Sequence, residues 1–307
     1  MYPESTSVSA TPGPPSGLER RRFLALASSA LVSLAGGARS AEPAGNPEFA
    51  FAFVTDTHLG RSPSEEKTLP RLVDAINRSP AVLTLFGGDL VDNGQEPGHD
   101  RRYPAWKEIV KGLKKDWYAV AGNHDPDELF CKHVQAETDF SVEQEGVRFV
   151  CFRDAQPNPG HDGLVTPEQL RWLQDQCDSA GRKGQRVILV AHVIYHENKH
   201  PDVGWYVKEG RAAFAMLLRA NPHVVAFLAG HFHCGLRGWD DTFGVQEVVL
   251  PSASWNQNRG LDKAPGYSVN EFRLGYVLSE VYRDRLRLHY CLLDGEPTVS
   301  RDLMLRS

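Results

Sequence analysis

Cysteine is scarce in this chain, and no two cysteines form a CxxC pair. A structural zinc ribbon is therefore not expected, because such sites use closely spaced cysteine pairs. The number of cysteines is odd, so at least one thiol stays outside any disulfide within the chain. We interpret them as small buried apolar residues. They are Cys131, Cys151, Cys177, Cys234 and Cys291.

The body of the chain also lacks a long basic run, and the formal net charge is −5 over 307 residues. This balance argues against dedicated nucleic-acid binding, because nucleic-acid-binding proteins carry clustered lysine and arginine. It does not exclude a small phosphorylated ligand, since bound metal ions can supply local positive charge.

Long apolar runs are missing as well. The apolar stretch at residues 25–35 is shorter than the roughly 20 residues that span a bilayer, so we expect no transmembrane anchor in the mature chain. We find no internal repeat and no strong boundary of a second domain.

The N-terminal part has the composition of an export signal. Residues 1–17 are rich in Pro, Ser, Thr and Gly, which predicts disorder. A basic segment at 19–24, the apolar stretch and small residues at 36–41 follow in the order of a secretory signal. The segment 20–24, RRRFL, resembles the R-R-x-F-L pattern of twin-arginine signals. We therefore expect a signal peptide over residues 1–40, a twin-arginine export machinery as partner, and a periplasmic or secreted protein exported in the folded state.

The remaining residues, 48–305, are expected to form one domain in which strands alternate with helices. This alternation, followed by strands near the end, predicts an α/β fold. Helices are expected at 64–78, 104–113, 127–134, 166–179 and 208–219, with Thr166 as N-cap and Pro167 at the first helical position of the fourth. Strands are expected at 49–55, 82–86, 117–121, 187–191, 224–229, 245–250, 276–282 and 286–291, with a hairpin over 140–152 that turns at Glu145 and Gly146.

The most informative pattern is an apolar strand that ends in polar residues. Residues 82–86 lead through Gly87 and Gly88 to Asp89. Four other apolar segments end in the same way, and in open α/β folds ligands bind at the carboxyl ends of strands. The polar residues at the five ends include Asp56, His58, Asp89, Asn123, His192, His231 and His233.

These side chains are oxygen and imidazole ligands without a thiolate, a set that suits divalent or trivalent ions such as Fe, Mn or Zn. Seven ligands exceed the needs of one ion, so we expect two, with Asp89 bridging them through its two oxygens. A dinuclear site acidifies a bound water and holds both the attacking and the leaving oxygen of a displacement at phosphorus.

Five short motifs in this order resemble the blocks of the calcineurin-like metallophosphoesterases. They are Asp56-x-His58, Gly88-Asp89-x-x-Asp92, Gly122-Asn123-His124-Asp125, Ala191-His192 and Gly230-His231-x-His233. The resemblance covers about residues 49–293. It implies a four-layer α/β/β/α sandwich, in which two mixed β-sheets lie face to face between helices.

The resemblance also assigns roles. It implies one metal ion held by Asp56, His58, Asp89 and His233, and another held by Asp89, Asn123, His192 and His231. His124 would be a proton donor or transition-state stabiliser rather than a ligand, and Asp92 would orient it. A buried carboxylate suits that task, because it fixes the tautomer of an imidazole.

Two departures narrow the expectation. Asp92 stands where purple acid phosphatases carry a tyrosine ligand, so an iron–tyrosinate centre is not expected. Asn93 stands where protein Ser/Thr phosphatases carry an arginine, which disfavours that role.

The sequence thus predicts an exported phosphoesterase that uses a metal-bound hydroxide on a small phosphorylated substrate, either a phosphomonoester or a phosphodiester. A non-catalytic binding scaffold of the same fold is the alternative. The substrate stays open between a nucleotide, a phospholipid headgroup and a cell-envelope pyrophosphate, to be selected by loops at 195–206 and 239–258. No catalytic role is expected for the surface or cleft-lining residues His99, His161, His196 and His200.

Overall fold

The computed structural model describes residues 45–197, 204–256 and 272–306. The predicted signal peptide, residues 1–40, lies outside this part of the chain. Within the described part, none of the helices combines the length and the apolar character that crossing a bilayer requires.

The first of two large sheets has the strand order β14-β13-β12-β1-β2-β3. β1, β2 and β3 run parallel to one another, whereas β12, β13 and β14 are antiparallel to their neighbours. The bounds are β1 Phe49–Val54, β2 Leu83–Phe86, β3 Asp116–Ala119, β12 Gly275–Val281, β13 Arg285–Leu292 and β14 Pro297–Met304.

The second large sheet has the order β10-β11-β9-β7-β5-β4. Its four central strands are parallel and both edge strands are antiparallel. The bounds are β4 Phe140–Gln144, β5 Val147–Cys151, β7 Arg186–Val190, β9 Val224–Ala229, β10 Arg237–Thr242 and β11 Val245–Val249. Two short strands, β6 Gly163–Leu164 and β8 Val207–Glu209, pair separately.

An apolar core lies between the two sheets. Phe51 of the first sheet and Phe149 of the second meet edge to face, with ring centroids 5.0 Å apart. Both belong to one cluster of buried side chains that draws from both sheets. Alternate residues of each strand point to opposite faces, so the other faces of the sheets need helices to cover them.

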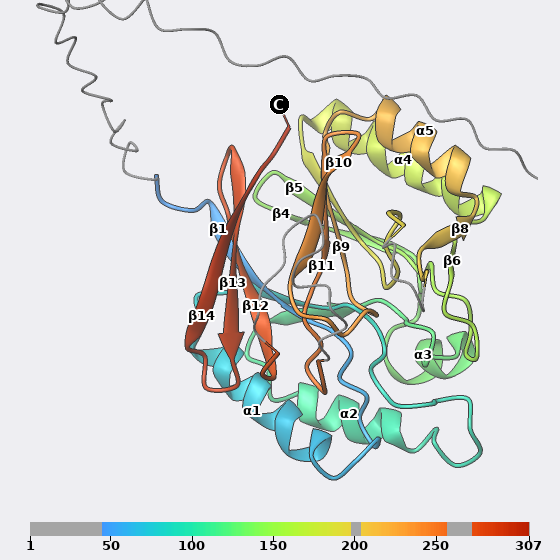
Figure 1. Ribbon diagram of the computed structural model, residues 1–307, viewed down its shortest axis with the longest axis vertical. Coiled ribbons are helices and arrows are strands. Elements are labelled where there is room, and N and C mark those ends of the chain that lie inside the picture. Colours follow the sequence, from blue (N-terminus) through green and yellow to red (C-terminus); the bar gives the residue numbers. More distant parts are fainter. Residues whose placement is uncertain (1–44, 198–203, 257–271, 307) are drawn as a thin grey trace, which may run out of the picture. The chain divides into compact units, whose positions relative to one another are not determined.

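Helices supply that cover. α1 (Glu65–Arg78), α2 (Arg102–Val110) and α3 (Asp127–His133) bury apolar side chains in a cluster with the first sheet, and α4 (Pro167–Lys183) and α5 (Arg211–Ala220) do so with the second. Figure 1 shows α1 and α2 on one side of the two sheets and α4 and α5 on the other. The predicted four-layer α/β/β/α sandwich is therefore confirmed.

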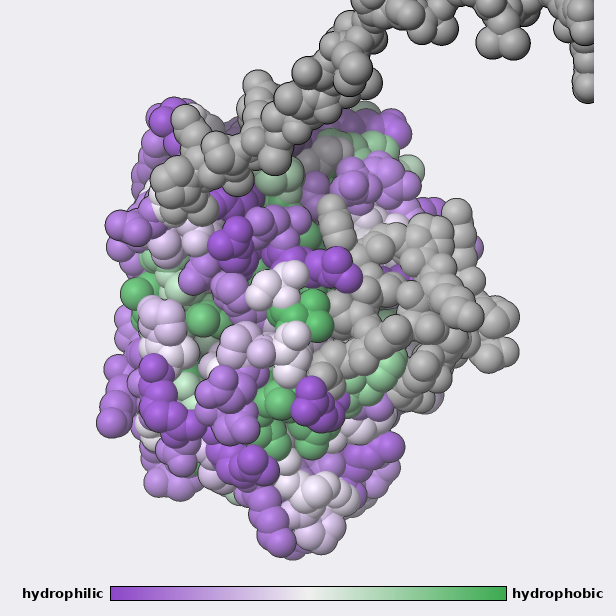
Figure 2. Space-filling model, turned by 60° about the vertical axis from the view of Figure 1, so that its left-hand side comes forward, coloured by the Kyte–Doolittle hydropathy of each residue, from purple (hydrophilic) through white to green (hydrophobic). Residues whose placement is uncertain are grey.

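The surface carries few large apolar side chains. Among the described residues, Val82, Met216 and Met304 are the exposed ones. The face shown in Figure 2 is accordingly mostly hydrophilic, with apolar side chains in small spots.

Some of the local structure predicted from the sequence is present, and some is not. The hairpin turn is present, with φ of 42° at Glu145 and 79° at Gly146, and Thr166 caps α4 through a capping box with Gln169. The expectation for residues 208–219 was wrong at its start, because Val207–Glu209 form a strand and the helix begins at Arg211. The loop expected from residue 239 was also wrong, since Trp239 is buried in β10.

Candidate metal centre

The carboxyl ends of five strands bring the predicted ligands to one place, where the two sheets meet. β1, β2 and β3 end there in the first sheet, and β7 and β9 end there in the second. Nδ1 of His192 donates to the carbonyl oxygen of Gly87 at 2.7 Å, which links the end of β7 to the end of β2. The turns that follow these strands therefore face a common space.

Five of the seven predicted ligands have a left-handed backbone. The φ angles are 56° at Asp56, 41° at His58, 51° at Asp89, 71° at His231 and 49° at His233. This conformation costs a side-chain-bearing residue roughly 1–2 kcal/mol. Strain of this kind gathers at functional sites, where the surrounding fold holds it in place. Here the sharp turns direct the side chains into the common space.

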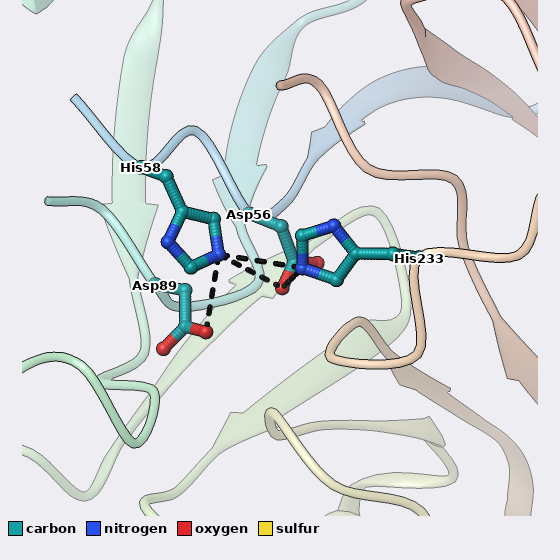
Figure 3. Close-up of side chains that lie close together, drawn as sticks. All are labelled: Asp56, His58, Asp89 and His233. Atoms are coloured by element: carbon teal, nitrogen blue, oxygen red, sulfur yellow. Dashed lines mark hydrogen bonds and ion pairs between the residues drawn. The ribbon is translucent and has the colours of Figure 1, made fainter. Parts of the chain in front are cut away.

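One group of four side chains surrounds a first candidate ion position. Asp56, His58, Asp89 and His233 place one ligand atom each within 4.8 Å of the others, and all four are buried. Nε2 of His58 lies 3.3 Å from Nε2 of His233, and the latter lies 3.1 Å from Oδ1 of Asp56. Figure 3 shows these side chains converging from three loops.

A second group shares Asp89 with the first. Asp89, His192 and His231 form it, and Nε2 of His192 lies 3.1 Å from Nδ1 of His231. Oδ2 of Asp89 lies 3.4 Å from Nε2 of His58 and 3.3 Å from Nε2 of His192. Oδ1 accepts the backbone N–H of His124 at 2.9 Å. The bridging of two ions by both oxygens of Asp89 stays a prediction; here one oxygen faces both groups and the other accepts from the backbone.

Asn123 adds an amide that lacks a partner. Its side chain is 2 % exposed and lines the same cavity as Asp89 and His231, yet neither its oxygen nor its nitrogen makes a hydrogen bond to a described residue. Buried amide groups are nearly always hydrogen-bonded, so this one suits a ligand position. The donor set thus fits two metal ions.

Each of the four histidines has one ring nitrogen held by an acceptor. The acceptors are Oδ1 of Asp92 for His58 Nδ1 at 3.1 Å, the Gly87 carbonyl for His192 Nδ1, the His161 carbonyl for His231 Nε2 at 2.9 Å, and the Trp255 carbonyl for His233 Nδ1 at 2.9 Å. An acceptor oxygen takes the proton of a neutral ring on that side, so the other nitrogen would offer its lone pair to a metal ion in the shared space. Metal-binding histidines are held in this way. Burial opposes a charged His192, but Asp89 and Asp56 outweigh it and raise its pKa to about 10, so that ring must release a proton when an ion binds.

Charge in the site also favours cations. Burial by itself would raise the pKa of Asp56 and of Asp89, but neighbouring histidines hold both below the usual range, so both carboxyls are ionised. Burial and the charge of His192 lower the pKa of His231 to about 3, which leaves that ring neutral. Two buried carboxylates require positive charge nearby, which a metal ion held by these residues would supply.

The predicted pairing of Asp92 with His124 is corrected. Oδ1 of Asp92 lies 3.8 Å from Nδ1 of His124, which is beyond a hydrogen bond, and the carboxylate instead accepts from His58. Nδ1 of His124 accepts the backbone N–H of Asn93 at 2.9 Å. The ring proton of neutral His124 is therefore on Nε2, and the backbone, rather than Asp92, fixes this tautomer.

A cavity of about 110 Å³ opens over the two groups of ligands. Its lining includes four residues outside the predicted set, namely Arg61, His161, Trp205 and Trp255. His161 was expected on the surface or in the cleft, and it lies in the cleft. Both tryptophans lie in the loops expected to select the substrate, whereas nothing in the sequence marked Arg61.

Other residues also depart from or extend the expectations. Asp154, which sequence reasoning missed, is buried and accepts the backbone N–H groups of His192 and Val193 at 3.0 Å each, so it fixes the turn after β7. His99 and His196 do not line the cavity, and His200 lies outside the described residues.

The chain is similar in sequence to one protein family and to several known phosphoesterases and diphosphatases. The family model described as calcineurin-like phosphoesterase matches residues 49–235, a span that contains all seven predicted ligands. A probable glycerophosphodiester phosphodiesterase of Arcobacter nitrofigilis is 29% identical over 190 residues, which are 59% of this chain and 65% of that protein. The manganese-dependent ADP-ribose/CDP-alcohol diphosphatase of Xenopus laevis is 30% identical over 95 residues, which are 29% of this chain and 24% of that protein.

These matches span less than two thirds of the length of the curated relatives. Among solved structures, a dimetal phosphatase from Danio rerio superposes with a TM-score of 0.66 at 14% identity, covering 84% of this chain and 99% of that one. This likeness shows the fold, and the family model covers more than half of the sequence. The chain therefore belongs to the calcineurin-like phosphoesterase family.

Proposed function

We propose that this chain is a metal-dependent phosphoesterase that hydrolyses phosphomonoester or phosphodiester bonds of a small substrate at a dinuclear centre. The observation that carries the proposal is the shared position of Asp89, whose Oδ2 lies at almost equal distances from the imidazoles of two ligand groups. A single ion would leave one of these groups without a cation.

The residues that would hold the ions follow from the two groups. Asp56, His58, Asp89 and His233 would hold one, and Asp89, Asn123, His192 and His231 would hold the other. When bound, the ions supply Lewis acidity at the phosphoryl group and acidify the attacking water.

His124 would act from the wall of the cavity. Its Nδ1 is occupied by the backbone N–H of Asn93, so Nε2 carries the proton. We propose that Nε2–H donates a hydrogen bond to the oxygen of the leaving group and stabilises the negative charge that develops there, without transferring its proton.

The relatives support diester and diphosphate bonds as the first substrates to test. One is described as a phosphodiesterase and the other as a diphosphatase that depends on manganese. Manganese is accordingly the first metal to restore, with iron and zinc as alternatives that the oxygen and imidazole ligands also suit.

The test combines metal content with hydrolysis by the full chain. Bis-4-nitrophenyl phosphate and 4-nitrophenyl phosphate are assayed before chelation, after chelation, and after Mn²⁺, Zn²⁺ or Fe²⁺ is restored. We expect turnover to vanish on chelation and to return with metal, and Asp89→Asn to abolish it. Bound metal without turnover of either ester, or of a diphosphate diester, would instead favour the binding scaffold.

We also propose that the chain is exported in the folded state by a twin-arginine machinery and is periplasmic or secreted. The basic segment, the apolar stretch and the small residues within 19–41 support this. Replacing Arg20 and Arg21 by lysine is expected to retain the protein in the bacterial cytoplasm. Unchanged fractionation of the variant would contradict the proposal.

A further inference from the structure

We propose that Arg61 binds a second phosphoryl group of the substrate, so that the preferred substrates are diphosphates. This inference rests on the proposed function, because it places the reacting phosphoryl group at the metal centre. Its own evidence comes from the position of Arg61 in the cavity, its stacking on Trp255 and the absence of other partners for its guanidinium among the described residues.

Arg61 lies at the exposed edge of the cavity, whereas the predicted metal ligands that line it are buried. A phosphoryl group at the metal ions would therefore occupy the inner part, with the next group of the substrate nearer to Arg61. Among the described residues that line the cavity, Arg61 is the only arginine or lysine, and its side chain is exposed there.

Stacking fixes the guanidinium in advance of binding. Its central carbon lies 3.3 Å from the centroid of the Trp255 ring, and the ring of His233 lies 3.9 Å from the same indole. The same indole thus contacts both the guanidinium and a predicted metal ligand, which places Arg61 beside the metal centre and leaves less side-chain freedom to be lost on binding.

The donors of Arg61 are not used elsewhere in the described part of the chain. The guanidinium makes no hydrogen bond or ion pair to any described residue. The charge of Arg61 contributes to lowering the pKa of Asp92, but Oδ1 of Asp92 accepts from His58 and its Oδ2 lies 3.4 Å from the Asn93 amide. A planar guanidinium with free N–H groups matches two oxygens of a phosphate.

The spacing selects a diphosphate. In a diphosphate the next phosphoryl group is one bridging oxygen away from the reacting one. It carries a negative charge that can pair with the guanidinium of Arg61. A monoester offers no second anion. A simple diester carries an uncharged alcohol group at the mouth.

The test compares the affinities of ADP and AMP for the manganese-loaded full chain by titration calorimetry. The two probes share their nucleoside and differ by one phosphoryl group. We expect Arg61→Gln to weaken ADP binding roughly 10- to 100-fold, as for the loss of a charge-assisted hydrogen-bonded contact, and to change AMP binding less than about threefold. Arg61→Lys should retain part of the preference, because it keeps the charge without the planar fork.

Arg71→Gln is the matched control. Arg71 is exposed on α1, outside the cavity, so this variant removes the same charge and should leave both affinities unchanged. An equal loss for AMP and ADP in Arg61→Gln, or no loss for either, would overturn the inference. Thermal unfolding checks that the variants are folded. If Arg61→Gln does not fold, the ADP and AMP affinities of Arg61→Lys decide whether Arg61 sets the preference.

Failure of the proposed function gives a different result. Wild-type protein that hydrolyses neither simple esters nor a diphosphate diester, but still binds ADP through Arg61, would defeat the hydrolase proposal and leave the role of Arg61 intact. Hydrolysis by a protein whose preference for ADP over AMP does not depend on Arg61 would support the hydrolase proposal and defeat the role of Arg61.

Discussion

At the scale of single residues, His124 shows how the backbone sets a tautomer. Because Asn93 N–H occupies Nδ1, the group proposed to stabilise the leaving oxygen is the Nε2–H hydrogen-bond donor. We expect His124→Ala to lower kcat roughly 10²- to 10³-fold, the usual effect of removing one donor to a developing negative charge, with an unchanged unfolding midpoint. His289→Ala, on β13 and outside the cavity, is the control for loss of an imidazole. Near wild-type turnover in His124→Ala would remove this residue from the mechanism.

Asp92 is predicted to act on the metal centre through His58. Its Oδ1 accepts from His58 Nδ1 at 3.1 Å, which leaves Nε2 free to bind an ion. We expect Asp92→Ala to weaken Mn²⁺ binding about 10- to 100-fold, the typical effect of removing a carboxylate that orients a ligand. Asp92→Asn keeps an acceptor oxygen and should weaken it less. Calorimetry that shows full metal affinity together with lost turnover would return Asp92 to a role on His124.

At the scale of elements, the end of β9 depends on a glycine. A Cβ at Gly230 would lie against Oγ1 of Thr55 and 2.5 Å from Oδ2 of Asp56, a predicted ligand. We expect Gly230→Ala to lower the free energy of unfolding by roughly 1–3 kcal/mol, as other overpacked sites do, and to weaken metal binding by displacing Asp56. Gly45→Ala, where a Cβ would meet nothing within 4 Å, should change neither quantity. Urea unfolding and metal titration of both variants test this, and equal behaviour would refute it.

Strands with an apolar sequence that ends in polar residues could be predicted from the sequence. Strands that exist only because they pair with a neighbouring strand could not. β1 and β9 are apolar along their length, so their patterns indicated buried strands. β14 is largely exposed at the edge of its sheet, and only its pairing with β13 makes it a strand. β8 is short and lies directly before α5, so its pairing with β6 was equally hidden.

The site shows the same limit. The seven ligand types follow strands and could be predicted, and the structure brings them together. The contact of Arg61 with Trp255 joins segments almost 200 residues apart, and neither residue belongs to a motif. The partner of Asp92 was missed because the choice between His58 and His124 depends on differences of less than 1 Å.

At the scale of the whole molecule, the metal centre should tie the two sheets together. Its predicted ligands follow β1, β2 and β3 in one sheet and β7 and β9 in the other. We expect Mn²⁺ to raise the unfolding midpoint and chelation to lower it, with about 2.7 kcal/mol gained at a metal concentration 100 times Kd. Scanning calorimetry of the full chain with Mn²⁺ and with a chelator measures the shift. A midpoint that does not respond to chelation would speak against a bound ion that spans the sheets.

A buried glutamate away from the metal centre should make the free energy of unfolding depend on pH. Glu247 of β11 is fully buried, accepts the backbone N–H of His196 at 2.6 Å, and accepts Oγ1–H of Thr242 in β10 at 2.8 Å. Burial raises its pKa to about 7, with a further contribution from the charge of Asp241 and opposition from its hydrogen bonds. The ordinary value is 4.5.

Between these two values the folded chain binds a proton at Glu247 that the unfolded chain has released. The contribution of Glu247 to the free energy of unfolding is therefore fully present below about pH 4.5 and is lost as the pH rises toward 7. Glu247→Gln keeps an acceptor oxygen and removes the titration. We expect the variant to gain stability relative to wild type by up to a few kcal/mol between those pH values, as measured by urea unfolding at several pH values. A stability difference that stays constant over this range would mean that Glu247 does not titrate there, and the loss of stability toward neutral pH would then belong to another buried carboxyl.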